Sequence, residues 1–211
     1  MNVLVTGGAG YIGAHCCLEL ARHGFPPVVY DNLSTGHRAH VRWGEFFEGD
    51  IGDAARLDDV FGRCRIEAVM HFAAFIEVGE SVADPLKYYA NNVAGSLQLV
   101  RAMRRHGIAR IVFSSSAAVY GSPQRVPIDE EHPTRPLNPY GRTKLMVEHI
   151  LEDCERSHGL RWMALRYFNA AGADPAAQIG EWHDPESHLI PRILDAAADG
   201  DRPVQVYGTD Y

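Results

Sequence analysis

The sequence of 211 residues predicts an α/β fold, a doubly wound parallel sheet with helices on both of its faces. Short apolar runs of strand length alternate with stretches of helical periodicity over residues 1–172. A glycine-rich turn joins the first such pair, and a carboxylate ends the second apolar run, which is typical of the Rossmann type of this fold. We expect a first domain over residues 1–172 and the beginning of a smaller C-terminal domain over residues 173–211.

The first turn is the stretch around which the chain is organised. Val3–Val5 has the length of a buried strand, and Ile12–Leu20 has the apolar period of a helix that ends near Gly24. Because glycine has no Cβ, backbone N–H groups there can approach a pyrophosphate, and a helix N-terminus adds donors and partial positive charge. An ordinary glycine-rich turn is the alternative for such a motif taken alone. The glycines fit both G-x-x-G-x-x-G and G-x-G-x-x-G, at Gly7, Gly8, Gly10 and Gly13.

A carboxylate after the second apolar run favours the dinucleotide interpretation. Val28–Tyr30 is followed by Asp31, 18 residues after Gly13. A carboxylate at this distance can accept hydrogen bonds from the adenosine ribose hydroxyls and would repel a 2′-phosphate. The pattern therefore predicts NAD rather than NADP as cofactor, although Arg38 lies nearby in the sequence.

The next strands are expected at residues 45–50 and 67–72. Asp50 ends the first of them, where it can border adenine or cap a helix, and Asp53 is expected to cap the helix that follows. Small residues, Ala73 and Ala74, follow the second and would let the chain pass close to a cofactor.

A helix over residues 85–106 carries two adjacent asparagines, Asn91 and Asn92. Asparagine is mildly unfavourable inside a helix, which indicates that one of the two faces inward, with plain exposure as the alternative.

Hydroxyl groups gather where the fifth strand is expected to end. Residues 110–113 lead into Ser114, Ser115 and Ser116, and ligands of open parallel sheets bind beyond the carboxyl ends of strands. A polar strand exit without function is the alternative.

A tyrosine and a lysine open the next helix on one face. Tyr140 and Lys144 stand four residues apart, ahead of an apolar stripe that begins at Val147. A free tyrosine is a poor base at neutral pH, and a nearby ammonium favours its ionised form. Tyr140, Lys144 and a serine hydroxyl can therefore move a proton to or from a sugar or alcohol oxygen beside NAD.

The remaining elements are a sixth strand over residues 161–168, a helix over 189–198 and a strand over 204–207. The loop from Asn169 to Gly172 leaves the sixth strand.

Composition excludes several classes of function. The net charge of −7 gives no basic footprint for nucleic acid, and no apolar run approaches the length of a membrane span. The N-terminus enters a strand at once and resembles no signal peptide, so we expect a cytoplasmic enzyme.

Neither disulfides nor a metal site are expected. The cysteines form no C-x-x-C pair, and Cys16, Cys64 and Cys154 are predicted to be reduced core thiols. Among the eleven histidines only His183 and His188 are close in sequence, at a spacing that is poor for ligands on a helix.

Motifs along the whole chain resemble those of the extended short-chain dehydrogenase/reductase family, in its nucleotide-sugar epimerase branch. They are the V-T-G-G-A-G-Y-I-G turn, Tyr30-Asp31-Asn32, Glu48-Gly49-Asp50-Ile51, His71-Phe72-Ala73-Ala74, Val78-Gly79-Glu80-Ser81, Asn91-Asn92-Val93, Ser114-Ser115-Ser116, Val119-Tyr120-Gly121, Asn138-Pro139-Tyr140-Gly141 and Leu165-Arg166-Tyr167-Phe168-Asn169.

This resemblance implies roles for individual residues. Tyr140 would be the base, Lys144 would bind the nicotinamide ribose and tune Tyr140, and Ser116 would touch the sugar hydroxyl. The implied cofactor contacts are Gly7, Gly10, Tyr11, Ile12, Gly13, Asp31, Asn32, Leu33, Ser34, Asp50, Ile51, Phe72, Ala73, Ala74, Ile76, Asn91, Ser114, Tyr140, Lys144 and Phe168. The implied substrate contacts are Ser116, Tyr140, Asn169, His188 and Leu189.

The activity that the resemblance implies is inversion of C4 of a UDP-hexose, UDP-galactose to UDP-glucose, through a transient 4-keto sugar and NADH. Related dehydratases need an extra acid where this chain has Ala117 and Ala118, which favours an epimerase. Epimerases acting on N-acetylated or pentose sugars stay open, and so does an NAD-binding sensor on the same fold.

The chain also departs from the family. Ile76 stands where members often carry a lysine, and members continue beyond Tyr211 into the rest of the substrate domain. Family members often dimerise through two helices, for which residues 85–106 and 141–158 are candidates, so a homodimer is expected.

Overall fold

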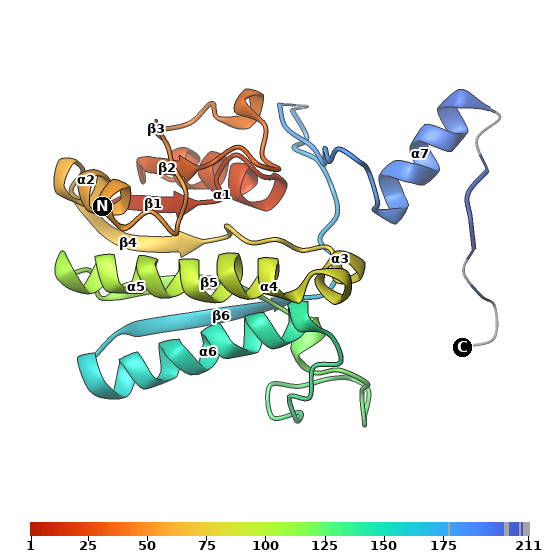
Figure 1. The fold of residues 1–211 in the computed structure, drawn as a ribbon. Helices are drawn as coiled ribbons and strands as arrows, with labels where there is room; N and C mark the ends of the chain where they lie inside the picture. Colours follow the sequence, from red (N-terminus) through yellow and green to blue (C-terminus); the bar gives the residue numbers. More distant parts are fainter. Residues whose placement is uncertain (177, 201–202, 207, 209–211) are drawn as a thin grey trace. The chain divides into compact units, whose positions relative to one another are not determined.

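The computed structural model describes residues 1–176, 178–200, 203–206 and 208. The chain divides into two compact units, Met1–Ala170 and Ala171–Tyr211. The first contains one six-stranded parallel sheet in the order β3-β2-β1-β4-β5-β6, so the predicted fold class is confirmed (Figure 1). The units divide two residues before the expected boundary, and the substrate role of the second remains a prediction.

The strands and helices alternate as the sequence predicts. The strands are β1 (Asn2–Thr6), β2 (Pro27–Asp31), β3 (Glu45–Glu48), β4 (Ile66–His71), β5 (Arg110–Ser116) and β6 (Arg161–Tyr167). The helices of the first unit are α1 (Tyr11–Arg22), α2 (Ala54–Arg63), α3 (Val78–Ala83), α4 (Pro85–Tyr88), α5 (Ser96–Arg105) and α6 (Pro139–His158), and α7 (Leu189–Asp199) lies in the second. Short turns of 3-10 type lie at Arg38–His40 and Ala117–Val119.

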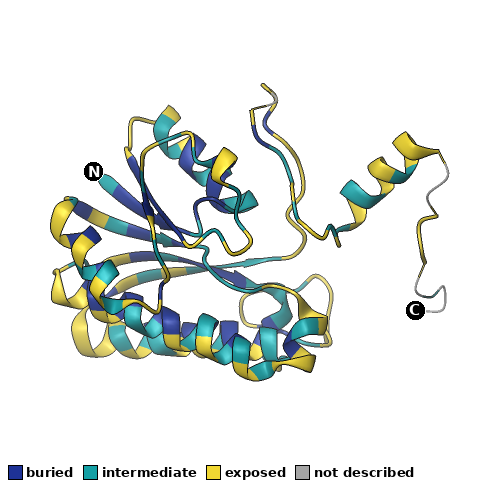
Figure 2. Cartoon of the chain, turned by 45° about the horizontal axis from the view of Figure 1, so that its top comes forward, coloured by how far each residue is buried: buried dark blue, intermediate teal, exposed yellow. Residues whose placement is uncertain are grey.

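Burial of the central strands on both faces holds the sheet together. All five residues of β2 are buried, and four of the five in β1, as Figure 2 shows by colour. Helices α2, α5 and α6 cover one face, and α1 lies on the other (Figure 1). Parallel strands need this cover because both of their faces are apolar.

Capping residues fix where the helices begin. Asp53 accepts a hydrogen bond from the N–H of Arg56 at 3.0 Å, which confirms it as the cap of α2. Asn138 caps α6 by accepting from the N–H of Gly141 at 2.8 Å, and Pro139 occupies the first turn. These caps place Tyr140 in the first turn of α6.

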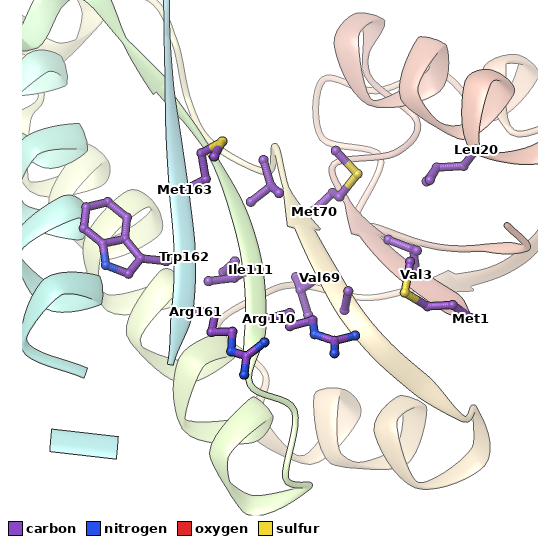
Figure 3. A pocket seen from close by; sticks show the side chains of 12 residues that line it. Met1, Val3, Leu20, Val69, Met70, Arg110, Ile111, Arg161, Trp162 and Met163 are labelled. Carbon is purple, nitrogen blue, oxygen red and sulfur yellow. The ribbon is translucent and has the colours of Figure 1, made fainter. Parts of the chain in front are cut away.

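A hollow of about 320 Å³ lies over the first unit's sheet, where Met70 of β4 and Met163 of β6 are in view (Figure 3). Met163 is 61% exposed, although it lies in the sheet. Arg110 and Arg161, the first residues of β5 and β6, also line this hollow. None of the predicted site residues lines this hollow.

The expected single helix over residues 85–106 is instead three segments. Helix α4 passes into a π-helical turn over Tyr89–Gly95, and α5 follows it. The wider turn contains both asparagines, and π-helical turns are frequent at functional sites. Asn92 is 2% exposed and faces inward, as predicted for one of the pair.

The cysteine prediction is partly wrong. All four thiols are free, but Cys17 is the buried one, packed in the apolar cluster beneath α1. Cys16, Cys64 and Cys154 are half-buried, and the last two pack against the edge of the main core. Cys64 lies just after α2, where the helix has ended, so its side chain is only partly covered.

The second unit is described by itself. Its helix α7 contains no buried residue, and residues 204–206 form no strand, contrary to expectation, because no other strand pairs with them among the described residues. Tyr207 and Tyr211 lie outside the described residues. None of the helices in the described part of the chain is long and apolar enough to cross a membrane.

Replacement of Asn92 by alanine should destabilise the first unit. The Asn92 side chain accepts from the N–H of Phe75 at 2.9 Å and donates to Phe75 O at 3.0 Å and to Thr143 Oγ1 at 3.2 Å. Asn92→Ala leaves the N–H and carbonyl of Phe75 without this partner and removes one of the bonds of Thr143 Oγ1, which should cost about 2–3 kcal/mol of unfolding free energy. Urea denaturation measures this loss.

The neighbouring Asn91→Ala is the matched control for that experiment. Asn91 donates one bond, to Asn92 Oδ1 at 2.9 Å, and is less buried, so its loss should cost less than about 1 kcal/mol. Similar losses in both variants would contradict an anchoring role for Asn92.

Candidate active site

The glycine turn between β1 and α1 is shaped by close approach of backbone segments. Gly7 has φ +72°, and a Cβ there would lie 2.5 Å from the backbone nitrogen of Ala73. A Cβ on Gly13 would lie 2.1 Å from the carbonyl oxygen of Gly7. Any larger residue at either position would separate β1 from the exit of β4 or from α1.

Gly10 differs from these two glycines, because a Cβ there would meet just the Gly7 oxygen, at 3.3 Å. The fold therefore leaves space on the outer side of Gly10. Gly10 caps α1 without any side-chain bond, and the first N–H to bond back along the helix is that of Ala14, to Gly10 O at 2.9 Å. The first turn of a helix offers N–H donors that can bind an anion, although the N–H of Gly10 itself donates to Gly7 O at 3.1 Å.

Asp31 ends β2 and holds the turns on both sides of the predicted ribose site. It is 8% exposed, and its carboxylate accepts from the N–H of Ala9 at 3.0 Å and of Leu33 at 2.8 Å. Leu33 has φ +57°, which is uncommon for leucine and is fixed by this bond. Burial raises the pKa of Asp31, and the two N–H bonds oppose that rise.

Asp50 and Asn32 lie together, as their shared predicted role requires. Asn32 Nδ2 donates to Asp50 Oδ2 at 2.7 Å, and the N–H of Gly52 donates to Asp50 Oδ1 at 2.7 Å. Asp50 therefore caps a turn and still stays exposed, so both interpretations of it remain compatible with the structure. Ile51 is 4% exposed and belongs to the core, which leaves its backbone for any contact with adenine.

The exit of β4 passes directly over the glycine turn. The N–H groups of Phe72 and Ala73 donate to Thr6 O at 2.9 and 3.1 Å. Ala73 and Ala74 are half-buried, and their small side chains match the expected close passage. Ile76 is 43% exposed at the far end of this segment.

The three predicted catalytic side chains come together beyond β5. The Ser116 hydroxyl, on the last residue of β5, forms a hydrogen bond with the Tyr140 side chain. Lys144 Nζ lies 5.8 Å from the centre of the Tyr140 ring. It donates to Ser114 O at 2.8 Å, and the Lys144 residue is 3% exposed.

Burial dominates the ionisation of this group. It raises the pKa of Tyr140, and the hydrogen bond from Ser116 opposes that rise. Burial also lowers the pKa of Lys144 to about 7. The expected lowering of the tyrosine pKa by Lys144 is therefore not found in the chain alone, because the ammonium is itself destabilised by burial.

Sequence reasoning missed a buried ion pair beneath the site. Glu148 is 4% exposed and accepts from Ser115 Oγ at 2.5 Å and from Arg166 Nη2 at 2.6 Å. Glu148 follows Lys144 by one helical turn and stands beside Val147 of the apolar stripe. A carboxylate at this position was the sequence signal that could have indicated a buried ion pair. The pair ties α6 to β5 and β6, so it positions Ser116 and Tyr140 indirectly.

His71 was missed as well. It ends β4, is 2% exposed, and bonds Thr6 Oγ1 at 2.7 Å and Ser96 Oγ at 2.8 Å. Burial, with a smaller effect of Lys144, lowers the pKa of His71 to about 3, so the ring is neutral. A polar residue inside the apolar run 67–72 was the available signal.

The other predicted residues fall in two groups. Phe168 and Asn169 follow β6 and are exposed, Phe168 by 65%. His188 and Leu189 belong to the second unit, where they are the cap and first residue of α7. The predicted substrate contacts are therefore divided between the two units.

Lys144 should make the stability of the cofactor-free protein rise with pH. The unfolded lysine keeps its ordinary pKa of 10.5, whereas the folded value is about 7. Between these values the unfolded chain binds more protons, so the wild type gains stability as the pH rises. Lys144→Met lacks this gain, although loss of the bond to Ser114 O lowers its stability at every pH.

Urea unfolding at about pH 7 and about pH 9 measures the difference. We expect the free energy of unfolding to rise more steeply in the wild type than in Lys144→Met. Parallel behaviour of the two proteins would mean that Lys144 keeps its ordinary pKa in the folded chain.

The fold and the glycine turn define a dinucleotide-binding protein of the Rossmann type. The sequence profile of the NAD dependent epimerase/dehydratase family matches residues 3–210, and the chain belongs to this family.

Two curated relatives of high identity carry the same name. The UDP-glucose 4-epimerase of Rhizobium leguminosarum bv. trifolii is 56% identical over 210 residues, covering 100% of this chain and 64% of that protein. The UDP-glucose 4-epimerase of Halalkalibacterium halodurans is 50% identical and is covered over 63% of its length. The chain therefore spans somewhat less than two thirds of the relatives it matches.

Solved structures agree with this result. UDP-glucose 4-epimerase from Brucella ovis, in complex with NAD, is 56% identical with a TM-score of 0.97, covering 100% of this chain and 65% of that one. The enzyme from Bifidobacterium longum, in complex with NAD+ and UDP, is 39% identical with a TM-score of 0.95, covering 100% and 66%. The family is NAD dependent, as the sequence predicted for this chain.

Proposed function

We propose that the protein containing this chain inverts C4 of a UDP-hexose, interconverting UDP-galactose and UDP-glucose with bound NAD. The observation that carries the proposal is the hydrogen-bonded pair of Tyr140 and Ser116, with Lys144 beside it at the carboxyl end of β5. Family membership and the relatives named UDP-glucose 4-epimerase support it.

The residues present fit NAD. The open side of Gly10 and the first turn of α1 would hold the pyrophosphate, and Asp31 with Asn32 would face the adenosine ribose. Bound NAD supplies a hydride acceptor at the sugar C4 and returns the hydride within one turnover, so it acts as a prosthetic group.

Tyr140 and Ser116 would move the proton. The ionised Tyr140 oxygen would take the proton of the sugar 4-hydroxyl, becoming the neutral hydroxyl, and would later return it, while Ser116 holds the tyrosine oxygen and the sugar oxygen in line. Lys144, fixed by Ser114 O at 2.8 Å, would bind the nicotinamide ribose and stabilise the ionised tyrosine. Asn169, His188 and Leu189 are proposed to contact the UDP-sugar.

The residues after Ser116 favour an epimerase over a dehydratase. Ala117 and Ala118 begin a 3-10 turn, and the N–H of Ala118 donates to Ser116 Oγ at 3.1 Å. Neither side chain can donate the additional proton that elimination of water needs. A sensor on this fold has no use for the Tyr140–Ser116 pair, which weighs against that alternative.

UDP-hexoses are favoured over N-acetylated sugars by the comparisons. Relatives at 50–56% identity are named UDP-glucose 4-epimerase, whereas the UDP-Glc/GlcNAc 4-epimerase of Campylobacter jejuni is 38% identical.

Tyr140→Phe should retain NAD but lose turnover. The phenyl ring fills the same space without a proton acceptor, so the rate of conversion of UDP-galactose to UDP-glucose should fall by about 100-fold or more. Ser116→Ala should show a smaller loss. Bound NAD is measured by release and absorbance, and turnover by a coupled assay.

Tyr88→Phe is the matched control, because it removes a buried hydroxyl that bonds Glu77 O at 2.7 Å, outside the proposed site. It should lower stability and keep turnover. Near-normal C4 inversion by Tyr140→Phe would refute the mechanism. Complete absence of transient reduced nicotinamide in the wild type with UDP-sugar would support the sensor instead.

We also propose a homodimer, formed through the segments 85–106 and 141–158 and a second copy of the chain. Leu86 of α4 and Met146 of α6 are 77% and 43% exposed, which supplies apolar surface on both segments. Light scattering should give twice the chain mass, and a monomer would refute this assembly. A cytoplasmic location stays a prediction, supported by the four free thiols.

A further inference from the structure

Four side chains of the kinds that ligate metal ions converge in the second unit, and one of them is His188, proposed above as a UDP-sugar contact. They come from the loop that precedes α7, and one ligand atom from each lies within 4.8 Å of all the others. The four residues are Glu181, His183, Glu186 and His188. A metal site was not expected, because the spacing of His183 and His188 is poor for two ligands on one helix. The segment that carries the four residues is a loop, so this argument does not apply to it.

The distances suit tetrahedral coordination. His183 Nδ1 lies 3.8 Å from Glu181 Oε1 and 3.4 Å from Glu186 Oε2. His188 Nδ1 lies 3.5 Å from Glu181 Oε1 and 3.0 Å from Glu186 Oε1. A tetrahedron with metal–ligand bonds of about 2.1 Å has edges of about 3.4 Å, which falls inside this range.

The arrangement also concentrates negative charge in a partly closed place. The side chains of Glu181 and Glu186 are 9% and 17% exposed, and both carboxylates face the same two imidazoles. The rings of His183 and His188 lie 4.3 Å apart between centres, and both present Nδ1 to the carboxylates. Two neighbouring carboxylates that face the same two imidazoles can be bridged by a cation held between them.

We propose that Glu181, His183, Glu186 and His188 form a binding site for a divalent transition metal ion, Zn²⁺ in the first place. Two imidazole nitrogens favour Zn²⁺ over Mg²⁺ or Ca²⁺, which prefer oxygen ligands alone.

The proposed ion is structural. Ligation by His188 through Nδ1 leaves its Nε2 for the UDP-sugar contact proposed above, so the two proposals do not compete for one atom. Because His188 caps α7, the ion would fix the loop at the point where this helix begins. The proposal does not depend on the proposed catalytic activity.

Zn²⁺ titration of the chelator-treated chain, without a histidine tag, tests the site. Calorimetry at neutral pH should show saturable binding of one equivalent by the wild type. His183→Ala and Glu181→Gln should each bind at least about 10-fold more weakly, the loss seen even for outer-shell partners of metal ligands. Co²⁺ should give the visible spectrum of a four-coordinate ion in the wild type and lose it in both variants.

His23→Ala is the matched control. His23 also faces a carboxylate, with Nδ1 3.9 Å from Glu19 Oε2, but the pair is exposed on α1 and has no second imidazole. This variant should bind Zn²⁺ as the wild type does. Circular dichroism should show that His183→Ala keeps its fold, since its substitution lies in the second unit.

Three outcomes would overturn the proposal. They are no saturable Zn²⁺ binding by the wild type, equal affinity of the wild type and His183→Ala, and binding of Mg²⁺ as tight as that of Zn²⁺. Resistance of the 180–188 segment to proteolysis that rises with Zn²⁺ in the wild type alone would support it independently.

Discussion

A buried chain of hydrogen bonds connects the glycine turn to helix α6, and the positions of both predicted half-sites depend on it. Each link is 3.2 Å or shorter. Its members are, in order, Thr6, His71, Ser96, Asn92, Thr143 and the carbonyl group of Tyr140. Buried polar groups of this kind must all be satisfied, so the elements that carry them cannot shift separately.

The protons in this chain can be assigned. Ser96 Oγ donates to Asn92 O at 2.5 Å, so it must accept from His71 Nε2. His71 is neutral because burial lowers its pKa to about 3, so its Nδ1 carries no proton and accepts from Thr6 Oγ1. The direction of every bond from β1 to α5 follows, and a charged His71 would reverse the bond with Thr6 Oγ1.

Much of this arrangement could be predicted from the sequence. The parts that were not predicted were missed for physical reasons. Periodicity and glycine spacing predicted the six strands, and the helical pattern after Asp53 predicted its cap, because these depend on local pattern. Ser116 and Tyr140 were expected to serve one reaction, and their closeness follows from the position of Ser116 at the end of β5. The pair of Glu148 and Arg166 and the convergence of residues 181–188 depend on tertiary contacts between residues whose spacing has no period. The π-helical turn was missed because its sequence is also compatible with an ordinary helix.

The electrostatics of the site bear on the roles proposed for Tyr140 and Lys144. Burial disfavours the charged forms of both, raising the pKa of Tyr140 and lowering that of Lys144 to about 7. A phenolate and an ammonium placed together offset part of that cost for each other, and ribose hydroxyls on Lys144 would replace the water it has lost. The chain alone therefore favours a neutral pair, and the ionised pair becomes accessible when bound groups complete the polar surroundings. A site of this kind avoids charge until substrate and cofactor are in place, because the same burial that disfavours the ions also strengthens their attraction once they form.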